Sequence, residues 1–263
     1  MKDITIIGGG NMGQAFAEGL AGSSLFGTII VADPTFRKSD KKNRQITFLQ
    51  DNREAVAGTK TVILAVKPQI LPEVLSEIKD VLPKDALVIS IAAGISIGNL
   101  EKILGKQAIV RVMPNICAKI GESMSVWVKN KRVSNNQIVL VKKILGSIGT
   151  ECELGGEELI DGATAISGSG PAYLFYLAEC ISEEAEKLGL PSKVADKLVR
   201  QTLFGSAKML KGDSRLPAEL RASVTSKGGT TEAAFREFES HKLAQTVSKG
   251  IQAAARRAKE LNK

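Results

Sequence analysis

The segment Gly8-Gly9-Gly10-Asn11-Met12-Gly13 lies between a short apolar run, Ile4–Ile7, and a stretch with helical spacing. It fits the pattern G-x-G-x-x-G, whose first glycine allows a tight turn and whose second lets the backbone approach a pyrophosphate. The third glycine lets helix and strand pack closely. The helix N-terminus then offers free N–H groups and a positive dipole end to phosphates. The motif therefore predicts a dinucleotide-binding turn; the alternative is a glycine-rich structural turn.

An acidic residue follows at the distance that such a turn requires. Asp33 ends the second predicted strand, twenty residues after Gly13. A carboxylate there can bind ribose hydroxyls and would repel a 2′-phosphate, which favours NADH. Thr35, Arg37 and Lys38 come directly afterwards and can hold that phosphate, which favours NADPH, or they belong to a solvated loop. The sequence therefore leaves the choice between NADH and NADPH open.

Strand and helix patterns alternate through the first half of the chain. Continuous apolar runs separated by segments of helical spacing, such as Pro68–Leu82, indicate βαβ units and a parallel sheet covered on both faces. A helix over Ser134–Ile148 completes this half. We expect an α/β fold with an N-terminal Rossmann-type dinucleotide-binding domain over residues 1–158. Its predicted strands are Ile4–Ile7, Thr28–Ala32, Gln45–Phe48, Thr61–Val66, Leu87–Ile91, Ala108–Met113 and Met124–Val128.

The pattern changes after about Asp161. Apolar residues between Leu174 and Leu188 recur every three and four positions, which indicates one helical stripe. Gly189 and Pro191 then end that helix and start another. We expect an all-helical domain over residues 159–263, in which further helices begin near Val194, after Gly229 and near Lys242.

Composition excludes several classes of protein. Among the 263 residues, 43% are hydrophobic and 24% charged, which is ordinary for a soluble globular chain. The net charge is +8, but aromatic residues make up only 4%, so a nucleic-acid stacking surface has little support. No apolar stretch is long enough to span a membrane, and no secretory signal is recognisable at the N-terminus. We therefore expect a cytoplasmic protein with no nucleic-acid or membrane partner.

Cysteine and histidine usage argues against a metal site. Cys117, Cys152 and Cys180 lie far apart without a C-x-x-C pair, which favours reduced thiols over disulfides or zinc ligands. His241 is the one histidine in the sequence, so a histidine-rich metal site is excluded. We expect no metal.

Two further glycine-rich segments combine small residues with hydroxyl groups, Ser167–Tyr173 and Thr225–Glu232. Each is predicted to open a helix, with Pro171 in a first turn and Thr230 and Thr231 near an N-cap. Plain helix capping is one interpretation. The other is that the two segments together supply N–H and O–H donors for a small carboxylate substrate.

The chain resembles the pyrroline-5-carboxylate reductases. The resemblance is carried in order along nearly the whole chain by GGGNMG, Ala65–Pro68, Ser90–Gly94, Arg111–Asn115, SGSGPAY and TSKGGTT. It implies reduction of the cyclic imine 1-pyrroline-5-carboxylate to L-proline with NADPH or NADH, the last step of proline biosynthesis. It also implies a Rossmann domain followed by a helical dimerisation domain, arranged as in 6-phosphogluconate dehydrogenase, and a homodimer that can assemble into rings.

The resemblance also assigns roles to residues. Thr231 would be the catalytic donor to the imine nitrogen, and the substrate would meet the loop around Ser169, Gly170 and Pro171 and the turn of Gly228, Gly229, Thr230 and Thr231. With Asp33, Thr35 and Arg37, the cofactor would contact Gly8, Gly10, Asn11, Met12, Gly13, Asn52, Ala65, Val66, Lys67, Pro68, Ala92, Ala93 and Ser223. The alternatives are a helix cap for Asn52 and a solvated strand end for Lys67.

Two departures from the family pattern bear on the expected site. Ile116-Cys117 stands where the family has Thr-Pro, which removes a hydroxyl and a proline from that loop. Lys227 stands where the family has proline, which adds charge and flexibility beside the expected substrate turn.

Two other functions remain open at this stage. A related reductase acting on a hydroxy acid or a deazaflavin would use a lysine as general acid or base, and Lys187, Lys193 and Lys197 are the candidates. A non-catalytic protein that senses a dinucleotide would bind cofactor without consuming it. Imine reduction needs no strong base, because the imine nitrogen is readily protonated in water, and this agrees with a chain that has one histidine.

Overall fold

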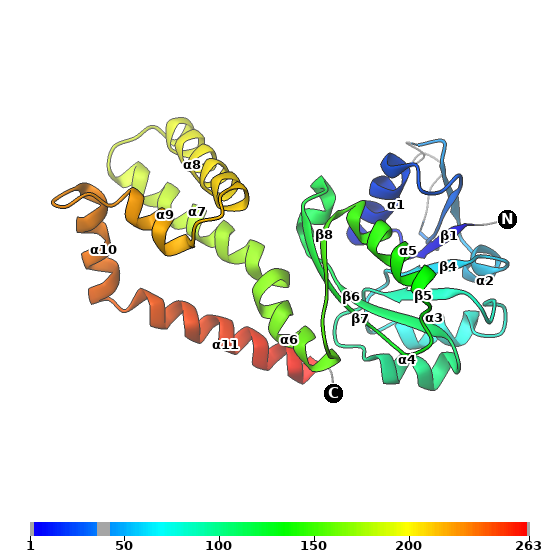
Figure 1. The fold of residues 1–263 in the computed structure, drawn as a ribbon. Coiled ribbons are helices and arrows are strands. Elements are labelled where there is room, and N and C mark those ends of the chain that lie inside the picture. Colours follow the sequence, from blue (N-terminus) through cyan, green and yellow to red (C-terminus); the bar gives the residue numbers. More distant parts are fainter. Residues whose placement is uncertain (1–2, 36–42, 262–263) are drawn as a thin grey trace. The chain divides into compact units, whose positions relative to one another are not determined.

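The computed structural model describes residues 3–35 and 43–261 (Figure 1). Within these residues, eight strands form one sheet in the order β3-β2-β1-β4-β5-β6-β7-β8. The strands β1 to β6 run parallel, β7 is antiparallel to β6, and β8 is parallel to β7. Their bounds are β1 Ile4–Ile7, β2 Ile29–Ala32, β3 Ile46–Leu49, β4 Thr61–Leu64, β5 Leu87–Ser90, β6 Ala108–Met113, β7 Ser123–Lys129 and β8 Gly149–Glu153.

Helices cover both faces of this sheet because successive strand side chains point to opposite sides. Ile4 and Ile6 join a core with α1 and α5, whereas Ile7 joins a second core with α3 and α4. The three layers and the mainly parallel strands confirm the expected Rossmann-type fold. The helices of this part are α1 Asn11–Ser23, α2 Asn52–Val56, α3 Leu71–Ile78, α4 Ile97–Leu104 and α5 Asn135–Gly146.

One strand was not predicted. The strand β8 has the sequence Gly149-Thr150-Glu151-Cys152-Glu153, and none of its residues is buried. It lies at the edge of the sheet, where only one neighbour, β7, supplies hydrogen bonds. An edge strand with two glutamates has no apolar run, so the pattern used for the other strands does not detect it.

The chain divides into two compact units. We call residues 1–169 with 254–263 the N-terminal unit and residues 170–253 the helical unit. The helical unit contains the predicted helices and one more, the seven-residue α9, whose short length gave too little periodicity to detect. The bounds are α7 Gly170–Lys187, α8 Ser192–Gly212, α9 Pro217–Ser223, α10 Thr230–Ser240 and α11 Leu243–Leu261, of which the last crosses into the N-terminal unit.

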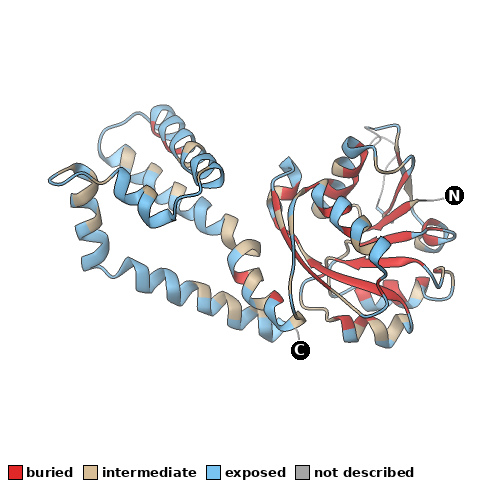
Figure 2. Cartoon of the chain, viewed as in Figure 1, coloured by how far each residue is buried: buried red, intermediate tan, exposed pale blue. Residues whose placement is uncertain are grey.

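Burial differs sharply between the units (Figure 2). Every residue of β1, β2, β4 and β5 is buried. Among the described residues of the helical unit, only Ala195 and Val199 are buried. No helix in the described part of the chain is long and apolar enough to cross a membrane.

The prediction that Ser167–Pro171 forms a loop is wrong. This segment is helical: α6 spans Ile160–Ala163, a π-helical turn spans Thr164–Gly168, and α7 begins at Gly170. The N–H of Ser169 donates to the carbonyl of Thr164 at 2.9 Å, and the Ser167 hydroxyl donates to the carbonyl of Ala163 at 3.0 Å. Small and hydroxyl residues therefore support a widened helical turn here, a local form often found at functional sites.

Candidate active site

Five neighbouring strands end at one edge of the sheet, and the predicted cofactor residues follow these ends. Backbone hydrogen bonds join the strand ends in turn: Asp33 N–H to Leu49, Gly8 N–H to Ala32 and Ala65 N–H to Ile7, at 2.8 to 2.9 Å. The order of strands reverses between β1 and β4, which is where dinucleotides bind in sheets of this type. The glycine turn, Asp33, Asn52, Ala65–Pro68 and Ala92–Ala93 thus belong to one row of loops.

The glycine turn has the geometry that a pyrophosphate needs. Gly8 has a φ of +104°, and a Cβ there would lie 2.7 Å from the carbonyl oxygen of Ala65. A Cβ on Gly13 would overlap the carbonyl oxygen of Gly8, whereas nothing lies within 4 Å of one on Gly10. Gly10 is the N-cap of α1 and no side chain caps the helix, so its first N–H groups are left for an anion. These features fit a dinucleotide.

Asp33 organises this turn from the end of β2. Its Oδ2 accepts a hydrogen bond from the N–H of Gly9 at 2.7 Å, and its Oδ1 accepts from the N–H and the hydroxyl of Thr35 at 2.8 and 2.6 Å. Partial burial disfavours the charged carboxylate, but the hydrogen bonds from Thr35 and Gly9 outweigh it and lower the pKa of Asp33. Arg37 and Lys38 lie outside the described residues.

Asn52 is the first residue of α2, and the alternative interpretation of it as the helix cap is wrong. The cap is Asp51, whose side chain accepts a hydrogen bond from the N–H of Glu54 at 3.0 Å. The Nδ2 of Asn52 donates to Oε2 of Glu77 at 2.9 Å. Its Oδ1 is buried and has no hydrogen-bond partner among the described residues. A buried acceptor of this kind is available to a donor on a ligand.

The loops after β4 and β5 complete the row. Ala65, Val66 and Pro68 are half-buried and Lys67 is exposed. Ala92 is buried and Ala93 exposed. Next to them, Gly94 has a φ of +75°, and a Cβ there would lie 2.5 Å from the carbonyl oxygen of Leu261. The last turn of α11 therefore packs on this loop, a contact that sequence reasoning missed.

The expected substrate residues divide between the units. Ser169 belongs to the N-terminal unit, and Gly170 and Pro171 begin α7 in the helical unit. The turn before α10 is held by short-range bonds: Gly228, with a φ of +75°, donates its N–H to Oε2 of Glu232 at 2.8 Å. Ser223 ends α9, and its hydroxyl donates to the carbonyl of Leu220 at 2.7 Å.

The two threonines of this turn do not cap the helix. The N-cap of α10 is Gly229, so the expected position of Thr230 and Thr231 near an N-cap is confirmed, but no side chain caps the helix and the interpretation of plain helix capping is wrong. Thr230 is exposed and Thr231 half-buried. Within the part of the chain that the structure describes, the hydroxyl of Thr231 forms no hydrogen bond. It is free to donate to a ligand.

An ion pair and an asparagine amide, which sequence reasoning missed, stabilise the N-terminal unit. Arg111 is buried in β6, and its Nη1 lies 2.7 Å from Oε1 of Glu157, which also accepts the N–H of Ile97 at 2.9 Å. Asn115 donates its Nδ2 to the carbonyl of Ser167 at 3.0 Å. Arg111 and Asn115 lie in the motif Arg111–Asn115, but nothing in the sequence pointed to their partners.

The departure at Ile116-Cys117 lies directly after Asn115. The Oδ1 of Asn115 accepts the N–H of Cys117 at 3.1 Å and so caps the short helix Ile116–Ile120. The loop therefore keeps a side-chain cap without the proline of the family pattern. At the second departure, Lys227 is exposed.

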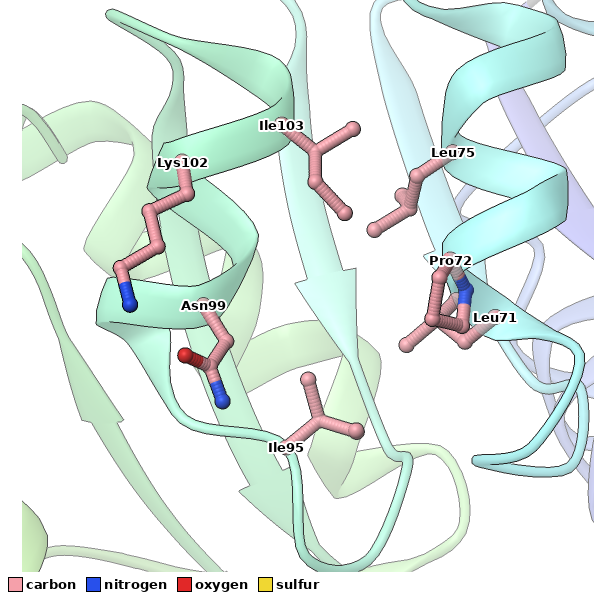
Figure 3. Close-up of a pocket in the computed structure, with 7 residues that line it drawn as sticks. All are labelled: Leu71, Pro72, Leu75, Ile95, Asn99, Lys102 and Ile103. Carbon is pink, nitrogen blue, oxygen red and sulfur yellow. The ribbon is translucent and has the colours of Figure 1, made fainter. Parts of the chain in front are cut away.

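Two cavities lie away from the predicted residues. One, of about 260 Å³, opens between α3 and α4, where Leu75 and Ile103 point toward each other (Figure 3). The other, of about 500 Å³, is lined by residues of the α4 start, the end of β7 and the segment after β8. Neither includes a predicted site residue. Among the residues that the structure describes, no group of His, Cys, Asp or Glu could hold a metal ion.

Family models match both parts of the chain. The model for pyrroline-5-carboxylate reductase dimerisation matches residues 157–261, and the model for NADP oxidoreductase, coenzyme F420-dependent, matches residues 3–94. The pyrroline-5-carboxylate reductase of a Synechocystis species is 36% identical over 99% of this chain and 98% of its own length. That of Pseudomonas aeruginosa is 37% identical over 98% of this chain and 96% of its own.

Solved structures agree with these similarities. A pyrroline-5-carboxylate reductase from Coxiella burnetii has a TM-score of 0.93 and 38% identity, covering 100% of this chain and 99% of that one. A pyrroline carboxylate reductase from Plasmodium falciparum with NADP bound has a TM-score of 0.89 and 32% identity, covering 100% of this chain and 98% of that one. This chain belongs to the pyrroline-5-carboxylate reductase family.

Proposed function

We propose that this chain reduces 1-pyrroline-5-carboxylate to L-proline with NADPH or NADH. The observation that carries the proposal is similarity over the full length: relatives named as this reductase are 31% to 38% identical along nearly the whole chain. The F420-dependent model reaches only residues 3–94, the part that binds the dinucleotide, and so does not favour a deazaflavin substrate.

The reaction adds a hydride to the imine carbon and a proton to the imine nitrogen, which gives the amine. The bound nicotinamide supplies the hydride, so the protein supplies binding and orientation. The turn Gly8–Gly13 and the N-terminus of α1 hold the pyrophosphate, while Asp33 and Asn52 lie toward the adenosine side. The loops Ala65–Pro68 and Ala92–Ala93 contact the rest of the cofactor.

Thr231 is proposed as the catalytic residue. Its hydroxyl is not used for capping and forms no other hydrogen bond among the described residues, so it can donate to the imine nitrogen. The N–H groups at the start of α10, beside Gly228 and Gly229, favour the substrate carboxylate. Ser169, Gly170 and Pro171 shape the pocket from the start of α7, and Ser223 contacts the cofactor.

The assembly is proposed to be a homodimer formed through residues 162–263, with dimers joining into a ring. The match of a dimerisation model over residues 157–261 supports the dimer, as do the exposed apolar side chains of α7. In functional terms we assign residues 1–158 to dinucleotide binding and 159–263 to dimerisation and substrate binding. Three free cysteines fit a cytoplasmic location, and no nucleic-acid or membrane role is proposed.

The alternative enzyme class has weaker support. A lysine that acts as general acid or base needs a pKa lowered by burial or by neighbouring charge. Lys187, Lys193 and Lys197 are exposed, and Lys187 is paired with Glu184 at 3.1 Å. None of the three has the surroundings that such a role requires.

The test is oxidation of the reduced cofactor, followed near 340 nm (about the absorption maximum of reduced nicotinamide), with pyrroline-5-carboxylate and either NADPH or NADH. We expect turnover with at least one cofactor and L-proline as product. Binding of both cofactors without oxidation would support the sensor alternative. Turnover only with a hydroxy acid or a deazaflavin would support the related reductases.

A further inference from the structure

A carboxylate of α3 holds the side chain of Asn52. Oε2 of Glu77 accepts a hydrogen bond from Nδ2 of Asn52 at 2.9 Å, and the backbone carbonyl of Glu77 accepts another from Nη1 of Arg53 at 2.6 Å. Both Asn52 and Glu77 are half-buried. The start of α2 is thus tied to the last turn of α3 by two contacts on one residue.

The chemistry of the Asn52–Glu77 pair determines which atom of the Asn52 amide remains without a hydrogen-bond partner in the described part of the chain. An ionised carboxylate only accepts hydrogen bonds, so the amide must present its NH₂ group to Glu77. The two ends of an asparagine amide are otherwise nearly interchangeable in shape. Glu77 therefore keeps Oδ1 as the buried atom without a partner among the described residues. Oδ1 of Asn52 can therefore accept a hydrogen bond from a donor group of a ligand, but it cannot bind an acceptor group.

The position of Asn52 indicates which half of a dinucleotide supplies the donor. Asn52 follows β3, and β3 lies beside β2, on the opposite side of β2 from the glycine turn of β1. In folds of this kind the ribose of the adenosine lies at the end of β2 and the pyrophosphate at the turn after β1. The loop after β3 is therefore placed on the adenosine side.

We propose that Glu77 is a positioning residue for cofactor binding. It locks the amide of Asn52 so that Oδ1 accepts a hydrogen bond from the adenosine half, either from a ribose hydroxyl or from the exocyclic amine. A fully ionised 2′-phosphate has only acceptor oxygens and cannot be the partner of this atom. The inference rests on the proposed function, since it needs a bound dinucleotide.

The experiment measures the dissociation constants of NADH and NADPH, by nicotinamide fluorescence, for Glu77→Leu, Asn52→Leu and the double variant. Each single substitution is expected to raise the constant about three- to tenfold, the effect of losing one hydrogen bond. The double variant should be no worse than Asn52→Leu, because Glu77 acts through Asn52. In turnover the loss should appear in KM for the cofactor and not in kcat.

Two further variants separate positioning from a general structural effect. Glu77→Gln keeps the size of the side chain and an oxygen that can accept from Nδ2 of Asn52, but its own NH₂ group can also donate to Oδ1 of Asn52. It should therefore fold as the wild type does and bind the cofactors with an affinity between those of the wild type and Glu77→Leu. Glu73→Leu removes an exposed carboxylate one turn earlier in α3 and should leave both constants unchanged.

An analogue identifies the donor. Reduced nicotinamide hypoxanthine dinucleotide carries an oxygen in place of the exocyclic amine. If Asn52→Leu still weakens binding of this analogue, a ribose hydroxyl is the donor. If the substitution has no effect on it, the amine is the donor.

Two results would overturn the inference about Glu77 but not the proposed function. One is additive effects of the two substitutions in the double variant. The other is an unchanged dissociation constant in Glu77→Leu when Asn52→Leu binds the cofactor more weakly. An unchanged constant in Asn52→Leu would also overturn the inference while leaving the reductase function in place, provided that the wild type oxidises the cofactor. A wild type that neither binds nor oxidises a dinucleotide would overturn the proposed function itself.

Discussion

The N-terminal unit and the helical unit bury their apolar residues to very different extents. In the N-terminal unit, Ile6 and Leu64 are 0% exposed and lie in cores closed by helices of the same unit. In the helical unit, Phe175 is 65% and Leu188 is 77% exposed. Large apolar patches left open in one chain mark surfaces that a partner covers. The first unit has its own closed cores, and we expect the second to be completed by another chain.

The largest expected effect comes from a charge on the open face of α7. Leu177→Glu should prevent dimerisation and abolish turnover, because a buried charge in an apolar interface is strongly unfavourable. Light scattering would show loss of the species with twice the 28.0 kDa chain mass. Val139→Glu on α5 of the N-terminal unit is the matched control: it is also about half exposed, at 53%, and should change neither mass nor turnover.

A wild-type mass near that of one chain at micromolar concentration would contradict the expectation that a second chain covers the apolar side chains of the helical unit. The helical unit would then be stable while its apolar side chains are exposed to water, and its stability would not depend on a dimer.

Substitutions in the glycine turn test whether the N-terminal unit folds and binds cofactor independently of the helical unit. Gly10→Val should keep the fold, since a Cβ there meets nothing within 4 Å, but should block approach of the pyrophosphate. Loss of two hydrogen bonds to charged groups, at about 1.5–3 kcal/mol each, weakens cofactor binding by roughly a hundredfold or more. Gly13→Val should instead unfold this unit, because its side chain would overlap the Gly8 carbonyl.

Fluorescence titration and thermal melting distinguish these outcomes. Normal cofactor affinity in a folded Gly10→Val variant would refute the assignment of this turn. The expected dimer mass should stay unchanged in that variant, because most of the proposed dimerisation region lies in the other unit.

The helical unit is expected to contribute to chemistry through Thr231, whereas most of the predicted cofactor contacts lie in the N-terminal unit. Thr231→Val keeps the shape and removes the hydroxyl donor, which should cost about 1.5–3 kcal/mol of transition-state stabilisation and lower kcat/KM about ten- to a hundredfold. The melting temperature should hardly change, because Thr231 does not cap α10. Steady-state kinetics and cofactor titration measure the two effects separately.

Thr230→Val is the neighbouring control, and its exposed hydroxyl should matter less. Unchanged kcat/KM in Thr231→Val would show that this hydroxyl is not the donor to the imine nitrogen.

The smallest expected effect is a pH dependence in the N-terminal unit. The pKa of Asp33 is lowered from its ordinary value of 3.8 by the hydrogen bonds of Thr35 and Gly9, which outweigh its burial. Its stabilising effect is therefore complete above about pH 5 and is lost as the pH falls through the lowered pKa. The difference in unfolding free energy between wild type and Asp33→Asn should be constant from about pH 8 to about pH 5 and shrink below pH 3.8. Urea unfolding at a series of pH values measures it, and a difference that does not vary with pH would contradict the lowered pKa.

Local chemistry made some features of the site predictable. The spacing of Gly8, Gly10 and Gly13 requires only neighbouring residues, and the structure shows the positive φ and the close helix–strand approach that such a motif needs. The helical segment around Ser167 was not predictable in the same way. Its glycines and serines favour a turn locally, yet Thr164 and Ala163 supply the carbonyls that keep it helical.

The sequence by itself determined the α/β alternation, the dinucleotide turn and the helices of the second half, because these depend on side-chain periodicity and on glycines within a few residues of one another. Only the tertiary structure decided which distant groups meet. Glu77 lies 25 positions from Asn52, Glu157 lies 46 from Arg111, and Gly94 meets Leu261 near the far end of the chain. Such contacts arise when strand order and helix packing bring remote segments together, and no local pattern encodes them. The edge strand β8 exists for the same reason, since a polar segment with weak propensity becomes a strand where β7 offers it a free row of hydrogen-bonding groups.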